Sequence, residues 1–142
     1  MHPIPPHALW VGHAGEVQDF RRVFDAGIKA LVELAAEEPP SQPPRELIYC
    51  RFPLLDGTGN ERQLLDLAIS SVANLLERKV PTLVACGRGL SRSPAVAAAA
   101  LALIYQEPPG ECLKRVAQHC HSDVSPGLWS EIASYLDSTR SL

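Results

Sequence analysis

One short stretch of the sequence combines residue types that could carry out chemistry on an anion. It reads Cys86-Gly87-Arg88-Gly89-Leu90-Ser91-Arg92-Ser93-Pro94. The thiolate of a cysteine is a nucleophile, and a guanidinium presents a planar pair of donors that matches two oxygens of a phosphate. Glycine allows backbone N–H groups to come close to a ligand. These residue types therefore indicate a phosphate site with a nucleophile beside it.

The position of this stretch between two apolar segments strengthens that interpretation. TLVAC, at 82–86, is typical of a buried strand, and the Ala-rich residues 92–105 predict a helix that is buried nearly all round. Unpaired N–H groups and the positive end of the helix dipole would then face the loop, and they would stabilise both a bound phosphate and the Cys86 thiolate. A thiolate that faces a bound phosphoryl group suggests in-line attack and a phosphocysteine intermediate.

The remaining segments alternate between strand and helix patterns. Strands are expected at 8–12, 28–34 and 46–52, and helices at 15–26, from an Asn60–Gln63 capping box to about Lys79, at 109–121, and from Ser125-Pro126 to about Asp137. The Pro-rich residues 37–46 predict a surface loop. This order predicts one α/β domain over residues 1–142, with a mainly parallel central sheet flanked by helices. Ligands of such sheets bind beyond the carboxyl ends of the strands, which is where the turn after Cys86 lies.

Asp56 is the candidate proton donor. It lies in the Gly-containing loop 54–60 after a predicted strand, so it could reach the same edge of the sheet and move when a ligand binds. Asp-Gly is also a common turn pair, which is the alternative interpretation. Asp66 is the nearest other acid, but it falls within the predicted helix and is expected to face solvent.

The Cys-x5-Arg spacing, in its fuller form Cys-x-x-Gly-x-Ser-Arg-Ser, resembles the cysteine-dependent protein tyrosine phosphatase superfamily and its dual-specificity branch. FPLLDGTG, at 52–59, resembles the general-acid loop of that family, and LWVG, IKALVEL and VSPGLW resemble other segments of its domain. The resemblance implies hydrolysis of phosphate monoesters, of phosphotyrosine and of phosphoserine or phosphothreonine, through a cysteinyl-phosphate. It also implies a catalytic domain that uses neither a metal nor another cofactor.

The resemblance assigns a role to each residue that matches the motif. Cys86 would be the nucleophile, and Arg92 would bind phosphate and stabilise the transition state. Asp56 would be the general acid and then the base for water, and Ser93 would help the thiolate leave. The substrate-binding positions would be Gly87, Arg88, Gly89, Leu90 and Ser91.

Two departures from the family pattern keep other functions open. Ala85 stands where the family usually has a histidine that orders the loop, which leaves open a phosphate-binding pseudophosphatase with weak turnover. Arg88 stands where many relatives carry alanine, and a second cation could favour a phosphoinositide or a multiply phosphorylated peptide. A sulfur-transfer or arsenate-reducing enzyme could use a similar cysteine and anion-binding loop, although Ser91-Arg92-Ser93 and the Asp56 loop favour a phosphatase.

Composition excludes several other classes. The chain has 142 residues, 13 basic against 16 acidic ones and a net charge of -3, so it lacks the basic field of a general nucleic-acid binder. The longest apolar run, 95–104, is shorter than the roughly 20 residues of a membrane span. No basic residue precedes an apolar stretch in MHPIPPHALW, so no signal peptide is expected. We therefore expect a cytoplasmic protein with reduced thiols that acts on a phosphorylated protein or a small phosphorylated molecule.

The other candidate metal or redox residues have simpler interpretations. Cys50 is expected to fill the core, although some relatives protect their nucleophile in a disulfide with a second cysteine. His119, Cys120 and His121 are too close in sequence to face one ion from a helix, so no metal site is expected. Trp10 and Trp129 are expected in the core or at its edge.

Overall fold

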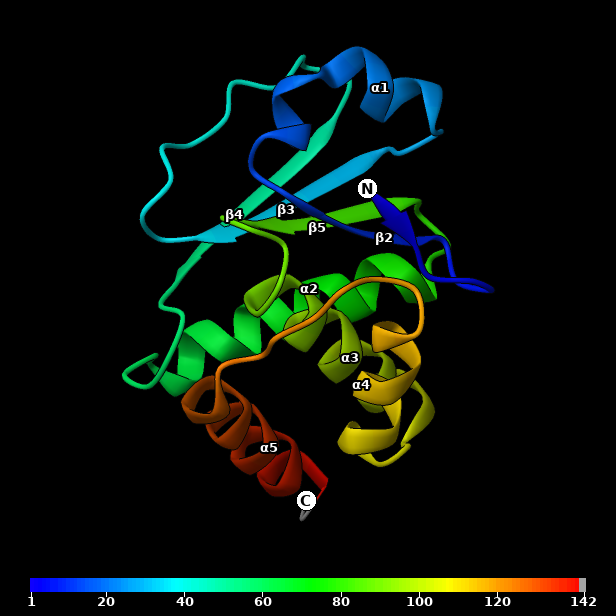
Figure 1. Ribbon diagram of the computed structural model, residues 1–142. Coiled ribbons are helices and arrows are strands. Elements are labelled where there is room, and N and C mark those ends of the chain that lie inside the picture. Colours follow the sequence, from blue (N-terminus) through cyan, green and yellow to red (C-terminus); the bar gives the residue numbers. More distant parts are fainter. Residues whose placement is uncertain (141–142) are drawn as a thin grey trace.

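The computed structural model describes residues 1–140 and has one five-stranded sheet at its centre (Figure 1). The strands are β1 (His2–Pro3), β2 (Leu9–His13), β3 (Ala30–Ala35), β4 (Ile48–Leu54) and β5 (Thr82–Cys86). Their order is β1-β2-β5-β3-β4, in which only β1 runs antiparallel to its neighbour. The predicted α/β class with a mainly parallel sheet is confirmed.

Helices cover both faces of this sheet. They are the 3-10 turn η1 (Glu16–Gln18), α1 (Phe20–Asp25), α2 (Arg62–Glu77), α3 (Arg92–Tyr105), α4 (Pro109–Ala117) and α5 (Pro126–Arg140). The first two lie on one face, and α2 to α5 lie on the other (Figure 1). Each face has its own apolar cluster, and the larger cluster is the one beneath α2 to α5.

The Ala-rich sequence of α3 explains its central place. Residues 92–102 are all buried, as predicted for a helix covered nearly all round. Alanine side chains are short, so α3 can contact the sheet, α2, α4 and α5 at the same time. Its first turn therefore has a fixed position relative to the ends of the strands.

Several predicted boundaries are wrong for local reasons. The predicted helix at 15–26 is divided, because the Asp19 carboxylate accepts the N–H of Arg22 at 3.1 Å and caps a separate α1. The Asn60 capping box does not form: Glu61 is the N-cap of α2, and the Asn60 amide instead binds both backbone groups of Leu55. In addition, α4 ends at Ala117 rather than at 121, and β1 was not expected.

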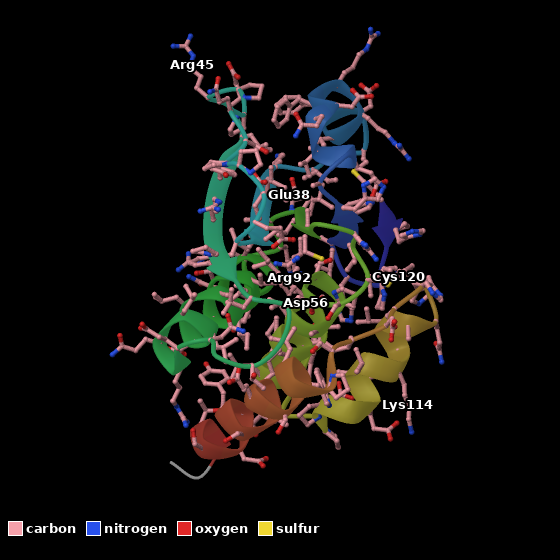
Figure 2. All side chains as sticks on the ribbon, turned by 60° about the vertical axis from the view of Figure 1, so that its left-hand side comes forward. Glu38, Arg45, Asp56, Arg92, Lys114 and Cys120 are labelled. Carbon is pink, nitrogen blue, oxygen red and sulfur yellow. The ribbon has the colours of Figure 1, made fainter. Side chains whose placement is uncertain are left out.

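The parallel strands bring three loops to one edge of the sheet. Glu37 lies just beyond β3, Asp56 just beyond β4, and Cys86 is the last residue of β5. Asp56 and Arg92 lie between the sheet and the helices, whereas Arg45 and Lys114 lie at the periphery (Figure 2). The fold thus positions the loop after Cys86 where the sequence placed it.

The sheet also separates Cys50 from Cys86. Cys50 pairs with Val32 on β3, and β3 in turn pairs with β5, so two strand spacings of about 4.8 Å each separate the β4 and β5 backbones. A disulfide needs Cα atoms closer than about 7 Å. Cys50 is half-buried against the core, and burial raises the pKa of its thiol. Its expected role as a core residue is confirmed.

The remaining expectations concern surface and edge residues. Trp10 and Trp129 are half-buried against the two apolar clusters, as predicted. Cys120 is buried and donates to the carbonyl of Val116 at 3.4 Å, while His119 and His121 are exposed. Within residues 1–140, no helix has both the length and the apolar character needed to cross a bilayer.

Candidate active site

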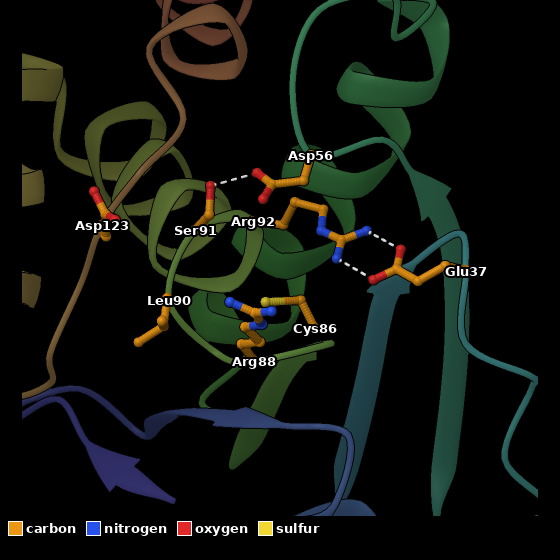
Figure 3. A pocket seen from close by; sticks show the side chains of 8 residues that line it. All are labelled: Glu37, Asp56, Cys86, Arg88, Leu90, Ser91, Arg92 and Asp123. Carbon is orange, nitrogen blue, oxygen red and sulfur yellow. Dashed lines mark hydrogen bonds and ion pairs between the residues drawn. The ribbon is translucent and has the colours of Figure 1, made fainter.

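A cavity of about 360 Å3 opens at the carboxyl edge of the sheet (Figure 3). It is lined by Glu37, Asp56, Cys86, Arg88, Leu90, Ser91, Arg92 and Asp123. Six of these residues were predicted from the sequence as site residues, and they come from two separate loops. Gly87 and Gly89 lie in the loop that follows Cys86, and Ser93 lies in the first turn of α3 after that loop. The structure therefore places all of the predicted site residues in or beside one pocket.

The Cys86 sulfur lies at the base of this pocket and is held by the start of α3. Cys86 is 3% exposed, and its Sγ accepts the backbone N–H of Ser93 at 3.4 Å. The Ser93 Oγ lies 3.0 Å from Sγ and 3.3 Å from the carbonyl oxygen of Gly12. A hydroxyl has one proton, so Ser93 can donate to the sulfur or to the carbonyl, but not fully to both.

The loop between β5 and α3 leaves backbone donors available. Gly89 has a φ of +74°, and a Cβ at this position would lie 2.9 Å from the Gly12 oxygen, so the loop requires glycine there. In the described part of the chain, the N–H groups of residues 88–91 have no acceptor. Unpaired donors at the start of a helix are suited to an oxyanion.

The guanidinium of Arg92 is buried, and two of its five N–H groups are unused. Nη1 donates to Glu37 Oε1 at 2.6 Å and to the Leu54 carbonyl at 2.9 Å, while Nη2 donates to Glu37 Oε2 at 2.5 Å. Nε is buried and has no partner among the described residues. Because Glu37 takes the edge between Nη1 and Nη2, the unused groups are Nε–H and the second Nη2–H, which share the adjacent edge. That edge can bind two oxygens of one anion.

Glu37 is a site residue that the sequence analysis missed. Its hydrogen bonds with Arg92 lower its pKa to about 2, and the same contact raises the pKa of Arg92. The turn that carries Glu37 is held by Arg51, whose Nη2 donates to the carbonyls of Ala36 and Glu38 at 3.4 and 3.1 Å. A signal was present, since the acidic pair Glu37-Glu38 follows the predicted strand 28–34 after two alanines and is therefore close to the ligand-binding edge.

The pKa of Glu37 predicts how one part of the stability depends on pH. Its folded value lies below the ordinary 4.5, so the stabilisation is complete above about pH 5 and is lost as the pH falls toward 2. We expect Glu37→Gln to unfold at lower urea concentration than the wild type at pH 6, and the difference to shrink by pH 3. Urea unfolding at both pH values measures this, and a difference that grows at pH 3 would contradict the assignment.

Asp56 is exposed at the rim of the pocket, and its carboxylate has one partner among residues 1–140. Its Oδ1 accepts the hydroxyl of Ser91 at 2.6 Å (Figure 3), and Oδ2 has no hydrogen-bond partner in the described part of the chain. The loop that carries Asp56 was predicted to be mobile, yet it is attached to α5. The Glu131 carboxylate accepts the N–H groups of Gly59 and Asn60 at 3.0 and 3.3 Å. These two bonds therefore fix the loop to α5 at Gly59 and Asn60, shortly after Asp56.

The outer rim carries one further cation and one further acid. Arg88 is exposed and forms no hydrogen bond or ion pair within residues 1–140. Asp123, which the sequence analysis also missed, lies on the connection between α4 and α5, where its N–H donates to the Leu90 carbonyl at 2.7 Å. Among the described residues that line the pocket, Leu90 alone has an aliphatic side chain.

Comparisons with known proteins identify the fold. No family model matches the sequence, and no curated protein sequence matches it. Solved structures do match along the whole chain. Human DUSP28 superposes with a TM-score of 0.86 at 21% identity, covering 99% of both chains. A mouse putative dual specificity phosphatase, crystallised with zinc tungstate, gives the same score and identity over 99% of this chain and 88% of its own.

A third match carries a different description. The human tyrosine phosphatase-like serine/threonine/tyrosine-interacting protein superposes with a TM-score of 0.81 at 16% identity, covering 100% of this chain and 98% of that one. The chain therefore has the fold of the dual-specificity phosphatase structures.

Proposed function

We propose that this chain is a phosphatase that hydrolyses phosphate monoesters through a cysteinyl-phosphate on Cys86. The observation that carries the proposal is the unused edge of the buried Arg92 guanidinium, in the same pocket as the Cys86 sulfur. A phosphoryl group has the charge and the oxygen spacing for that edge and for the free N–H groups of residues 88–91. The shared fold with dual-specificity phosphatase structures supports the same conclusion.

The first step transfers the phosphoryl group to sulfur. The Cys86 thiolate forms the S–P bond while the P–O bond to the leaving group breaks, and Asp56 gives its proton from Oδ2 to that departing oxygen. Arg92 and the loop N–H groups bind the three non-bridging oxygens throughout. The alcohol or phenol leaves, and Asp56 becomes a carboxylate.

The second step releases phosphate. Water attacks phosphorus as Asp56 Oδ2 takes one of its protons, and the S–P bond breaks to regenerate the thiolate. Ser93, whose Oγ lies 3.0 Å from Sγ, donates its hydroxyl to the departing sulfur. Asp56 is protonated again at the end, so the cycle closes without another reactant.

The lining of the pocket supports a broad choice of leaving group. None of the eight lining residues is aromatic, so no ring is available to select a phosphotyrosine by stacking. We propose that the pocket accepts alkyl as well as aryl phosphates, on proteins or on small molecules. The exposed, unpaired Arg88 at the rim favours substrates that carry a second negative charge, such as a phosphoinositide or a multiply phosphorylated peptide.

The role of Asp56 predicts an effect that depends on the leaving group. Replacement of Asp56 by alanine should lower kcat/KM, which reports the first step, by roughly 100-fold or more for an alkyl phosphate, which is the usual contribution of a general acid. The loss should be smaller for p-nitrophenyl phosphate in the first step, because p-nitrophenolate leaves without a proton. Steady-state kinetics on both substrates measure this. Equal losses would assign the acid role to another residue, and Asp123→Ala serves as the first comparison.

One rival function is phosphate binding without useful turnover. Ala85 motivates it, because it stands where the resemblance expects a histidine. Ala85 packs in the apolar cluster on the α1 face, whereas Cys86 packs on the opposite face of the sheet. A histidine at 85 would therefore not line the pocket, and we infer that its absence leaves the groups around Cys86 in place.

A p-nitrophenyl phosphate assay separates these functions. Turnover that depends on Cys86 supports the phosphatase, whereas anion binding without turnover supports the rival. Turnover of thiosulfate or arsenate, with none of phosphate esters, would instead support the sulfur-transfer or arsenate-reducing alternatives.

A further inference from the structure

The hydroxyl of Ser91 is buried between two parts of the site and has a partner on each side. Ser91 is 6% exposed, its hydroxyl donates to Asp56 Oδ1 at 2.6 Å, and its oxygen accepts the backbone N–H of Ser125 at 2.9 Å. The single proton is thus committed to Asp56, and one lone pair is committed to the start of α5. If Ser91 binds a substrate, it does so through its backbone N–H.

These bonds of the Ser91 side chain replace the hydrogen bond that a serine at the start of a helix usually forms. Ser91 is the N-cap of α3, and a serine at this position normally accepts an N–H of the first helical turn. Here the side chain forms no capping bond. The N–H of Ser93, the second helical residue, donates to the Cys86 sulfur instead. Because an N-cap serine at a candidate active site does not form the usual capping hydrogen bond, we infer that its hydroxyl is used for function.

The Ser91 bond distinguishes the two oxygens of Asp56. A carboxyl oxygen that accepts the Ser91 proton at 2.6 Å is not the one that carries the acid proton, so the proton must be on Oδ2. Oδ2 is also the oxygen left without a partner in the described structure, and the leaving group must approach it. Rotation of the carboxyl group by half a turn would turn the acid proton toward Ser91 and away from the leaving group.

Ser91 also links Asp56 to α5. Ser125 directly precedes α5, and its N–H fixes Ser91, while Glu131 on the next turns of α5 holds Gly59 and Asn60 beyond the acid. Asp56 is therefore held between the start of α3 and one face of α5.

We propose that Ser91 is a positioning residue for Asp56: its hydroxyl, supported by the Ser125 N–H, holds the carboxyl so that Oδ2 donates and later accepts the catalytic proton. The proposal rests on the phosphatase function proposed above. It assigns no contact between the Ser91 side chain and the substrate.

Replacement of Ser91 by alanine tests the proposal. A misaligned catalytic group costs roughly 10- to 100-fold, so kcat/KM for an alkyl phosphate should fall within that range. The loss of kcat/KM for p-nitrophenyl phosphate should be a few-fold at most, because the proton matters least for a good leaving group. Any loss that comes from hydrolysis of the shared cysteinyl-phosphate should lower kcat for both substrates without this difference. Ser70→Ala is the matched control, since Ser70 also donates to an aspartate, Asp66, at 3.0 Å outside the pocket, and it should leave both rates unchanged.

A double-mutant cycle gives the sharper outcome. In an Asp56→Ala background, Ser91→Ala should have no further effect on kcat, because the group that it positions is gone. An undiminished loss in that background, or equal losses of kcat/KM on both substrates in the single variant, would overturn the positioning role while leaving the phosphatase proposal intact. Absence of wild-type turnover would overturn both proposals.

Two further variants cover the case in which Ser91→Ala unfolds. Ser91→Gly should reproduce the leaving-group dependence of the alanine variant, and Ser91→Thr, which retains the hydroxyl, should restore alkyl phosphate turnover toward the wild-type rate. Thermal melts establish that each variant is folded. A folded threonine variant that is as slow as the folded glycine variant would contradict the proposal.

Discussion

Cys86→Ser is expected to abolish turnover of p-nitrophenyl phosphate, with a loss of about 10,000-fold or more, as found when a catalytic nucleophile is removed. A hydroxyl at this position is a much weaker nucleophile than a thiolate, and no histidine in the described structure lines the pocket to activate it. The N–H groups of residues 88–91 and the free edge of Arg92 do not depend on the sulfur. The variant should therefore still bind an oxyanion.

Anion binding distinguishes a lost nucleophile from a lost site. Tungstate or vanadate should raise the melting temperature of Cys86→Ser, because a ligand that binds the folded state stabilises it. Cys50→Ser is the matched control, since Cys50 lies on β4 and is separated from β5 by β3, and it should retain full activity. Near-wild-type hydrolysis by Cys86→Ser would show that another residue attacks phosphorus.

Arg92→Lys is expected to have the second largest effect. Lysine keeps the charge that pairs with Glu37, but it cannot bind Glu37 on one edge and two phosphate oxygens on another. Since removal of one oxyanion donor costs about 100- to 1,000-fold, we expect kcat to fall within or beyond that range. Steady-state kinetics with p-nitrophenyl phosphate measure this.

A surface arginine provides the control for Arg92→Lys. Arg115 also forms a two-point contact with a carboxylate, Glu107, at a position remote from the pocket. Arg115→Lys should leave kcat unchanged. If Arg92→Lys stayed within about threefold of the wild type, the free guanidinium edge would have no role in the transition state.

The parts of the fold that follow from side-chain pattern were predictable. β5 and α3 have the bounds that the sequence indicated, because a short apolar strand and an Ala-rich helix are both stable only when nearly all of their side chains are buried. The order of strands and helices implied a parallel sheet, and that sheet placed Asp56 and Cys86 at one edge. The nine predicted site residues therefore converge for a reason that a single sequence contains.

The parts that depend on tertiary contacts were not predictable. Ser91 was expected to line the phosphate site, but the partners that its hydroxyl takes depend on Asp56 and Ser125, which lie 35 and 34 residues away. The position of Glu37 after a predicted strand suggested a place at the ligand-binding edge, but its partner Arg92 could not be predicted, because the two residues meet only when β3 pairs with β5. Asn60 was likewise predicted to cap α2, but its side chain binds the backbone of Leu55 within its own loop.

The central claim is that Cys86 accepts the phosphoryl group, and trapping that intermediate tests it most directly. Asp56→Ala should be mixed with p-nitrophenyl phosphate and quenched in acid within its first turnovers, because the good leaving group departs unaided while hydrolysis of the intermediate lacks its base. Mass spectrometry should find one added PO3 group on the peptide that contains Cys86, and none when Cys86→Ser is combined with Asp56→Ala. An adduct on another residue, or burst release of p-nitrophenol with no protein adduct, would contradict the account.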